Sequence, residues 1–218
     1  LTHEIMNSVT PISSLSSSLN TKLKKDIADK GIAEAKTLDL LSEGLDAVAN
    51  RTKGLLSFTE SFRKLSKVPK PKMVEIELDK LFERMNTLFS STYQAKQIAF
   101  HYLISPELSV IFADPQQIEQ VFINLVQNGI DALNGKTNGE IAIKASKSFD
   151  GKAEITITDN GMGISDETID KVFIPFFTTK EKGSGIGLSL SRQIIRMHGG
   201  AIDLKSKIGE GTIINLKL

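Results

Sequence analysis

The chain has 218 residues, and 40% of them are hydrophobic, which is enough apolar material for one large or two small folded domains. Its 27 Lys and Arg residues nearly balance its 26 Asp and Glu residues, so bulk charge gives no reason to expect binding to nucleic acid or direct membrane contact. The lack of Cys excludes disulfides, thiolate metal ligands and a Cys nucleophile, and no run approaches the roughly 20 apolar residues of a membrane span. The sequence begins without Met inside a helical pattern, which suggests a fragment of a longer protein.

Residues 1–68 carry two apolar patterns of helical spacing and no pattern typical of a strand. The first steps by three and four residues through Leu1, Ile5, Val9, Ile12, Leu15 or Ser16, Leu19 and Leu23. Pro11 is expected to kink or loosen this helix, and a polar, Lys-rich turn around Gly31 follows it. The second pattern runs through Leu38, Leu41, Leu45, Val48, Thr52, Leu55, Thr59, Phe62 and Leu65 or Ser66.

One helical hairpin makes only half of a bundle core, because the apolar seams of its two helices need a partner. We therefore predict that residues 1–68 form an antiparallel hairpin and that two copies of the chain pair into a dimeric four-helix bundle. The alternative is a helical arm that packs on the C-terminal domain of its own chain.

Pro69 and Pro71 mark the boundary between residues 1–68 and a second domain, residues 69–218. Asp79 is expected to cap the first helix of this domain. Strands are expected at residues 73–78, 98–104, 108–112, 141–146, 153–158, 201–204 and 212–218, and helices at 79–95, 114–133 and 185–197. This order predicts an α/β sandwich with helices on one face of a mixed sheet, and hence an α+β chain.

The helix predicted to begin at Asp114-Pro115 carries two carboxamides and a carboxylate on one stripe. Asn124, Asn128 and Asp131 are spaced four and three residues apart, away from the apolar side of the helix. A carboxamide oxygen is a good hard ligand for Mg²⁺, which keeps several waters and also binds substrate phosphates. Such a stripe alone is more often a solvated polar face, and the glycine-rich blocks downstream are what favour a metal-assisted nucleotide site.

The block Asp159-Asn-Gly161-Met-Gly163 follows an apolar strand. A carboxylate buried at the strand end, as Asp159 would be, can accept a hydrogen bond from an exocyclic amine. Gly161 and Gly163 allow backbone angles with φ > 0 and let a flat ring approach closely. The alternative is an ordinary β-turn in which Asp has its usual role.

The block Gly183-Ser-Gly185-Ile-Gly187-Leu188 opens the last predicted helix. Free backbone amides at a helix start, without Cβ atoms in the way, suit oligophosphate. The spacing matches neither the P-loop nor the dinucleotide-binding motif, so neither of those folds is implied.

An aromatic segment, residues 173–177, lies just before the last glycine block. A segment with Pro, neighbouring glycines and several aromatics is a candidate for a mobile lid that packs when ligand is present. Lys180 or Lys182 could then reach phosphate, although each taken alone is more often a surface Lys.

Together these blocks resemble the nucleotide-binding boxes of sensor histidine kinases. Residues 1–7, Leu-Thr-His-Glu-Ile-Met-Asn, resemble the family's H box, which carries the phosphorylated His, so the resemblance covers nearly the whole chain. The other matches are residues 124–133 with the N box, 159–164 with G1, 173–177 with F, 183–188 with G2, 209–212 with the last box and 114–121 with the lead-in to the N box.

The resemblance implies a site for ATP with Mg²⁺. Asn128 would be the Mg²⁺ ligand, Asn124 a supporting polar group, Asp159 the adenine contact and Thr212 part of the adenine pocket. The other residues that the resemblance assigns to cofactor binding are Asp131, Gly161, Gly163, Ile164, Phe173, Phe176, Lys180, Lys182, Gly183, Gly185, Ile186, Gly187 and Leu188.

The resemblance also implies a protein-histidine kinase in which His3 is the phosphoacceptor and Glu4 its general base. A neutral imidazole is nucleophilic, and an adjacent carboxylate can orient the ring and take its proton. His3 lies two residues from both Leu1 and Ile5, so it is predicted to point away from the apolar seam.

Further expectations concern partners and location. The resemblance implies a homodimer through the N-terminal helices, a response-regulator receiver domain as phosphoryl acceptor, and a cytoplasmic location as the C-terminal part of a membrane-anchored sensor. Asn7 lies one turn after His3 and would hold a water that attacks the phosphorylated aspartate of the regulator, which gives the hypothesis of an additional phosphatase activity. Pro11 lies further from His3 than in more common H boxes, which affects the expected kink and docking geometry.

Three other interpretations share parts of the pattern. An ATP-gated dimerising ATPase of the gyrase and MutL kind would need a water-activating Glu where this chain has Asn124. A Ser/Thr kinase of the same superfamily would not need His3 and Glu4 on a dimerising helix. A degenerate module that binds ATP or a partner without phosphoryl transfer would not need all of the boxes, which are intact here.

Overall fold

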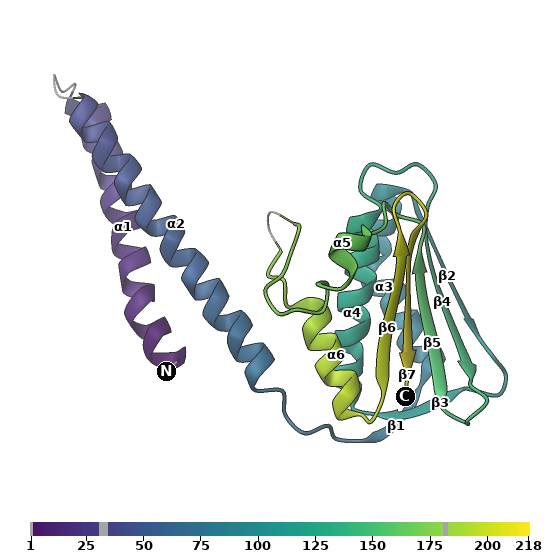
Figure 1. Cartoon of the computed structure of the whole chain (residues 1–218). Helices are drawn as coiled ribbons and strands as arrows, with labels where there is room; N and C mark the ends of the chain where they lie inside the picture. The colour runs from purple at the N-terminus through teal and green to yellow at the C-terminus, as the bar shows by residue number, and fades with distance from the viewer. Residues whose placement is uncertain (1, 31–34, 181–182) are drawn as a thin grey trace. The chain divides into compact units, whose positions relative to one another are not determined.

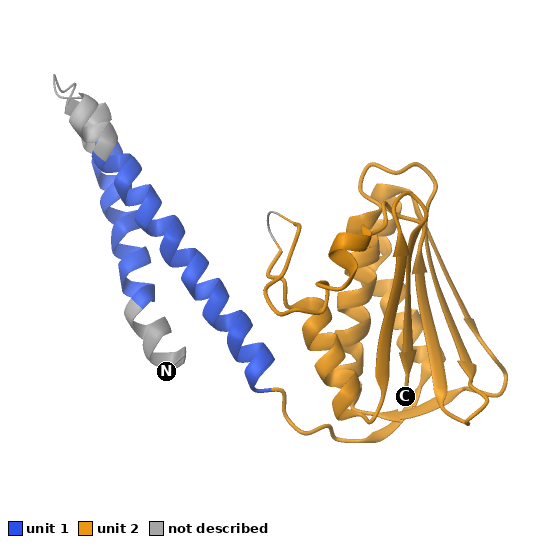
Figure 2. Cartoon of the chain, viewed as in Figure 1, with its two compact units in different colours: residues 1–67 blue, residues 68–218 orange. Residues whose placement is uncertain are grey.

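The computed structural model describes the chain apart from residues 1, 31–34 and 181–182, and it describes the side chains of residues 2–8, 26–30 and 35–40 no further than their helical backbone. Two compact units make up the chain, Leu1–Lys67 and Val68–Leu218 (Figure 2).

The first unit consists of two long helices, α1 (Thr2–Lys30) and α2 (Ala35–Ser66), which lie side by side (Figure 1). A polar cluster joins them: Asn20 accepts a hydrogen bond from Ser42 Oγ at 2.5 Å and donates another to Asp46. Lys24 forms an ion pair with the same Asp46 at 3.2 Å. The α-helical conformation of α1 continues through Pro11.

The side chains that this unit buries are not the large apolar ones of the predicted seams. Among the side chains described in this unit, the buried ones are small or polar and comprise Ser16, Asn20, Ser42, Ala49, Thr52, Thr59 and Ser61. Many of the large apolar side chains described on the two helices are exposed in the single chain, namely Ile12, Leu15, Leu19, Leu41, Val48, Leu55, Phe58 and Phe62. Within its described residues, a single hairpin therefore leaves much apolar surface uncovered.

The second unit alternates strands and helices. Its elements are β1 (Val74–Glu77), α3 (Leu78–Lys96), β2 (Ile98–Ile104), β3 (Val110–Ala113), α4 (Pro115–Ala132), β4 (Gly139–Lys147), β5 (Ala153–Asp159), α5 (Asp166–Ile169), α6 (Gly187–Met197), β6 (Ala201–Lys207) and β7 (Gly211–Lys217). The short α5 was not among the predicted elements, because four residues are too few for a helical period.

Five strands form one mixed sheet in the order β2-β4-β5-β7-β6, with β2 and β4 parallel and the other pairs antiparallel. Strands β1 and β3 form a separate antiparallel ribbon. Along β4 and β5 buried residues alternate with more exposed ones, so one face of the sheet forms the core. Helices α3, α4 and α6 cover that face (Figure 1), which confirms the predicted α+β fold with a mixed sheet. The largest fully buried side chains include Phe82, Phe122, Ile141, Ile155, Ile195 and Leu216.

One predicted helix cap is wrong. Helix α3 begins at Leu78 with Glu77 as its N-cap, and Asp79 lies in the first turn, where it accepts a hydrogen bond from Tyr102 Oη at 3.2 Å. Leu78 is fully buried and its N–H donates to Ser109 O at 3.0 Å. Packing of this leucine therefore places the N-cap at Glu77, two residues before the Asp79 that the capping preference indicated.

The N-terminus of α4 is a hydrogen-bonded junction. The helix starts at Asp114-Pro115, as predicted, with Asp114 as its N-cap, which accepts hydrogen bonds from Gln117 N at 3.1 Å and from Lys72 N at 2.8 Å. Gln117 Nε2 donates to Pro69 O at 3.0 Å. Asp114 N donates to Nε2 of His198, the C-cap of α6, at 3.0 Å. The junction thus holds residues 69–72 against the ends of α4 and α6.

Candidate nucleotide-binding site

Helix α4 carries the polar stripe predicted from the sequence, and the other glycine-rich blocks contact this helix. Asn124 Nδ2 donates to Gly187 O at 3.3 Å, at the first turn of α6. Asn124 Oδ1 accepts from Gln120 Nε2 at 3.0 Å, so the carboxamide is held at both ends. Asn124 therefore fixes α6 against α4.

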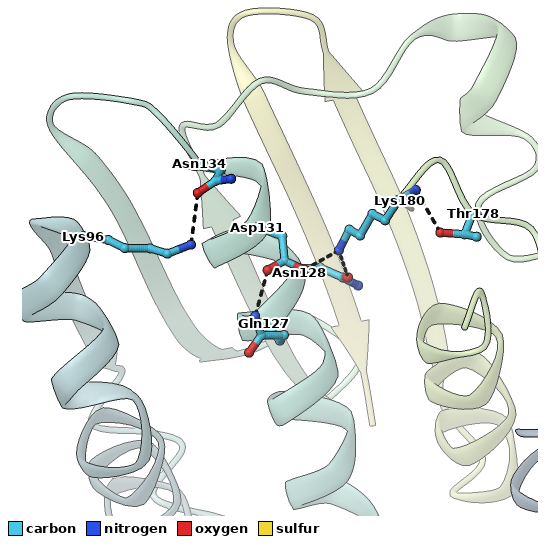
Figure 3. Close-up of polar contacts among 7 residues, drawn as sticks. All are labelled: Lys96, Gln127, Asn128, Asp131, Asn134, Thr178 and Lys180. Atoms are coloured by element: carbon cyan, nitrogen blue, oxygen red, sulfur yellow. Dashed lines mark hydrogen bonds and ion pairs between the residues drawn. The ribbon is translucent and has the colours of Figure 1, made fainter. Parts of the chain in front are cut away.

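Asn128 and Asp131 continue the stripe and meet one cation. Lys180 Nζ lies 2.9 Å from Asn128 Oδ1 and 2.6 Å from Asp131 Oδ2 (Figure 3). The other carboxylate oxygen of Asp131 accepts from Gln127 Nε2 at 2.8 Å. Lys180, which was predicted to reach phosphate, and Asn128, the predicted metal ligand of α4, are thus brought together.

Asp159 is the last residue of β5 and is buried. Its Oδ1 accepts a hydrogen bond from Gly161 N at 2.8 Å. Burial raises the pKa of Asp159, while hydrogen bonds from Gly161 and Thr212 and the charge of Lys136 act in the opposite direction. A buried carboxylate at a strand end is suited to bind a ligand that donates hydrogen bonds.

The two glycines after Asp159 are required for different reasons. Gly163 has φ +70°, as predicted, and a Cβ there would lie 2.0 Å from Lys207 O. Gly161 does not have the positive φ that was expected; a Cβ there would lie 2.7 Å from Ala132 Cβ. Close packing of the loop on α4, which the sequence could not reveal, therefore accounts for Gly161.

The last glycine block packs against the aromatic segment. Gly185 has φ +67°, and a Cβ on it would lie 2.5 Å from the carbonyl carbon of Phe176. Phe176 N donates to Gly185 O at 2.9 Å. Gly183 lies against Thr178 and Lys180. The glycines thus let two backbone segments run in contact.

Helix α6 begins at Gly187 rather than at the predicted residue 185. Its N-cap is Ile186, a buried residue, and Leu188 is half-buried in the first turn. Within the described residues no side chain caps this helix, so its first N–H groups are free to bind an anion.

Thr212 is buried and pairs with Asp159 across β7 and β5. Its Oγ1 lies 2.9 Å from Ser206 Oγ. Ser206 Oγ also accepts a hydrogen bond from Ile164 N at 2.9 Å and donates to Gly211 O at 2.7 Å. Ser206 therefore links two predicted site residues, although no motif in the sequence singled it out.

Arg192 is a second residue that the sequence did not reveal. Its guanidinium lies 4.9 Å from the centre of the Phe173 ring, and Nη2 donates to Phe173 O at 3.2 Å. This combination of a cation–π contact and a hydrogen bond ties the aromatic segment to α6. Its only sequence signal is a basic residue on the helix that follows the last glycine block.

Four predicted site residues cannot be placed at the level of their side chains. His3, Glu4 and Asn7 belong to α1, but the structure describes only their helical backbone. Lys182 lies outside the described residues. The described residues contain no group of three or more His, Cys, Asp or Glu side chains that could hold a metal ion. Across the same ranges, no helix is long and apolar enough to span a membrane.

Mg²⁺ fits the donor atoms on α4. Asn128 and Asp131 supply a carboxamide and a carboxylate oxygen, which are hard ligands, and these oxygens already surround a positively charged ammonium. Mg²⁺ completes such a partial set with waters and substrate phosphates.

Comparison with known proteins agrees with this geometry. Residues 113–218 match the family described as histidine kinase-, DNA gyrase B- and HSP90-like ATPase. The sensor histidine kinase ZraS of Salmonella typhimurium is 35% identical over 143 residues, which cover 66% of this chain and 30% of that protein. The chain thus spans about a third of the length of the curated relatives it matches.

Two solved structures are similar as well. The catalytic domain of histidine kinase ThkA is 34% identical, with a TM-score of 0.60, over 67% of this chain and 95% of that domain. A structure of ThkA in complex with the response regulator TrrA matches 100% of this chain and 60% of that chain, with 25% identity and a TM-score of 0.65. From its boxes, its fold and these relatives, the chain belongs to the sensor histidine kinases.

Proposed function

We propose that this chain is the kinase core of a two-component sensor: it binds ATP with Mg²⁺, transfers the γ-phosphoryl group to His3 and then to an aspartate of a response regulator. One observation carries the proposal. Helix α4 contacts the Asp159 loop through Gly129 and Ala132, the start of α6 through Asn124, and Lys180 through Asn128 and Asp131. Groups suited to adenine, phosphate and metal therefore converge on one helix.

Each group has a distinct part in ATP binding. Asp159 accepts a hydrogen bond from the exocyclic amine of adenine, and Gly161 and Gly163 let the loop after Asp159 pack closely on Ala132 and Lys207 beside it. The free N–H groups at the start of α6 and the Lys180 ammonium bind phosphate oxygens. Asn128 holds Mg²⁺, which when bound neutralises phosphate charge and favours attack on phosphorus.

The proposed transfer takes place at His3. A ring nitrogen of His3 attacks the γ-phosphorus, the bond from that phosphorus to the bridging oxygen of ADP breaks, and Glu4 takes the ring proton. Water is a poor competitor, because Asn124 stands where a gyrase-type ATPase needs a carboxylate base, and its carboxamide is occupied by Gly187 and Gln120. This argues against the ATPase alternative.

The test is incubation with γ-labelled ATP. We expect acid-labile, alkali-stable label in the wild-type chain and none in His3→Gln. The matched control is His101→Gln, since His101 is exposed on β2 and belongs to no box. Label that persists in His3→Gln would refute His3 as the acceptor.

A second copy of the chain is the proposed partner of α1 and α2. Many of their described large apolar side chains are exposed, up to 62% for Leu15, whereas the described side chains buried between the two helices are small or polar. We expect Leu15→Glu to weaken the dimer by about 100-fold or more, because a symmetric interface loses each buried leucine twice. Sedimentation equilibrium measures this, with Ser17→Glu, on another face of α1, as the control.

A response-regulator receiver domain is the proposed acceptor from His3, supported by the likeness to ThkA, which was solved with TrrA. Asn7 would position a hydrolytic water and give the chain phosphatase activity toward its phosphorylated regulator. Dephosphorylation by Asn7→Ala should be much slower than by the wild type, and an undiminished rate would refute this role.

A further inference from the structure

The geometry points to Asn128 and Asp131 as a two-oxygen cation site on α4, which the Lys180 ammonium fills until the metal displaces it. This inference rests on the proposed nucleotide site and deepens it. Asn128 alone was expected to hold Mg²⁺; the structure adds the carboxylate of Asp131 to the metal site and gives Lys180 a role before nucleotide arrives. The three side chains are drawn in Figure 3.

The Lys180 ammonium occupies the position that a metal ion would take on α4. Lys180 Nζ lies between Asn128 Oδ1 at 2.9 Å and Asp131 Oδ2 at 2.6 Å. These two residues are three apart on a helix, so their oxygens converge on the same face. A cation at that point is bound by one neutral and one charged oxygen, the kind of partial set that Mg²⁺ completes with waters and phosphates.

Both partners of the ion pair, Asp131 and Lys180, are held in place by further hydrogen bonds. Gln127 Nε2 donates to Asp131 Oδ1 at 2.8 Å, which leaves Oδ2 directed toward Lys180. On the other side, Lys180 N donates to Thr178 Oγ1 at 3.1 Å and Lys180 O accepts from Gly183 N at 3.2 Å. The carboxylate and the backbone of Lys180 are thus both fixed independently of the ion pair.

The ion pair between Lys180 and Asp131 is weak enough for a metal ion to replace the ammonium. The side chains of Lys180 and Asp131 are 44% and 35% exposed, and ion pairs at such positions contribute little to stability. A divalent ion carries twice the charge of the ammonium and competes for the same two oxygens. When it binds, Lys180 is released next to the start of the phosphate-binding glycine block, where its charge can meet phosphate oxygens.

The test is binding of Mn²⁺, a paramagnetic substitute for Mg²⁺, to the nucleotide-free chain, followed by loss of the free-ion EPR signal. We expect Lys180→Met to raise Mn²⁺ affinity about two- to fivefold, because the competitor is gone. Asp131→Asn should lower the affinity about tenfold, because a charged ligand is lost. An affinity that Lys180→Met leaves unchanged or lowers would overturn the inference, as would Asp131→Asn binding like wild type.

Lys96→Met is the matched control. Lys96 Nζ contacts Asn134 Oδ1 at 3.2 Å at the end of α4, so this variant removes the same charge near the same helix without touching Asn128 or Asp131 (Figure 3). Its Mn²⁺ affinity should equal that of the wild type; an increase matching that of Lys180→Met would mean that general charge, not occupancy, governs binding.

A double-mutant cycle and a nucleotide control complete the design. In the Asp131→Asn background the gain from Lys180→Met should shrink, because Asp131 is the charged partner that holds the lysine in place; a full gain there would contradict the shared site. ADP binding is measured in parallel. A wild-type chain that fails to bind ADP refutes the proposed function, whereas ADP binding without the Lys180 effect refutes only this inference.

Discussion

Asp159 is a carboxylate in surroundings that disfavour its charge. Burial raises its pKa, and the hydrogen bonds from Gly161 and Thr212 offset this only in part. The folded chain therefore binds a proton at Asp159 more readily than the unfolded chain does. Ionised Asp159 opposes folding at neutral pH, and this cost disappears as the pH falls through the raised pKa. Such a cost is consistent with a residue kept for binding.

Asp159→Asn separates binding from stability. We expect an unfolding free energy equal to or above that of the wild type at neutral pH, and an affinity for ADP at least about tenfold lower, because a charged acceptor for the adenine amine is lost. Urea denaturation and calorimetric titration measure the two quantities. Asp203→Asn, at an exposed position on β6, is the control. Unchanged ADP binding by Asp159→Asn would contradict the adenine assignment.

Gly163 and Gly209 have similar φ angles, so substituting each with Ala separates the cost of a steric clash from the cost of the left-handed conformation. Gly163 has φ +70° and Gly209 has φ +79°, but only at Gly163 would a Cβ meet backbone, at 2.0 Å from Lys207 O. Gly209→Ala should cost about 1–2 kcal/mol for the left-handed conformation alone. Gly163→Ala should cost about 2 kcal/mol more, because the strand end must move. Equal losses of unfolding free energy in urea denaturation would show that the backbone around Gly163 shifts to accept the Cβ at no cost.

At the scale of elements, α4 depends on the junction at its first turn. The Asp114 carboxylate caps the helix and also holds Lys72 N, and His198 of α6 accepts the N–H of Asp114. Although burial acts to raise it, the pKa of Asp114 is lowered overall by hydrogen bonds from the Lys72, Gln117 and Gln116 backbones. The helix that carries Asn124 and Asn128 is thus fixed at its N-terminus by the charged carboxylate of Asp114.

Asp114→Ala should lower the unfolding free energy by about 1–3 kcal/mol at neutral pH, from the lost cap and the unpaired Lys72 N–H. Because the pKa is lowered on folding, this stabilisation is present above the unfolded-state pKa and disappears as the pH falls through the folded-state pKa. The difference between variant and wild type should therefore shrink in acid, which thermal melts at several pH values measure. A difference independent of pH would mean that the carboxylate charge has no part.

In the second unit, Val68–Leu218, helices and strands were predicted correctly where the local sequence signal and the tertiary packing agree. The alternation in β4 and β5, the start of α4 at Asp114-Pro115 and the end of α6 at Met197 were all predicted from the sequence. The Asp79 cap was wrong because burial of Leu78 outweighed a capping preference of about 1 kcal/mol. In α1, the spacing allowed either Leu15 or Ser16 on the inner face, and only the contact with α2 selected Ser16.

At the scale of the whole molecule, the proline-containing segment between the units belongs to the second of them. Gln117 donates a hydrogen bond to Pro69 O, and Asp114 accepts one from Lys72 N. The hydrogen bonding of the second unit therefore includes residues that precede its first strand. The second unit accordingly begins at Val68, and it contains its own buried core.

Two fragments test the extent of this unit. Residues 68–218 should fold alone and bind ADP about as tightly as the whole chain, because the core and the described site residues lie within it. Residues 74–218 lack the hydrogen bonds made by Pro69 and Lys72, so their free energy of unfolding should be about 1–3 kcal/mol lower. Chemical denaturation of both fragments measures this, and equal stability would show that the linker contributes nothing.

The sequence by itself determined the family, the α+β class and the three blocks of the site, because helical spacing, strand alternation and glycine-rich turns are local patterns. Tertiary structure alone decided which blocks touch. It placed Lys180 between Asn128 and Asp131, assigned Gly161 to close packing on Ala132, and brought Ser206 and Arg192 into the site. These contacts join residues far apart in the chain, and their geometry depends on how the sheet and its helices pack, which no local pattern encodes.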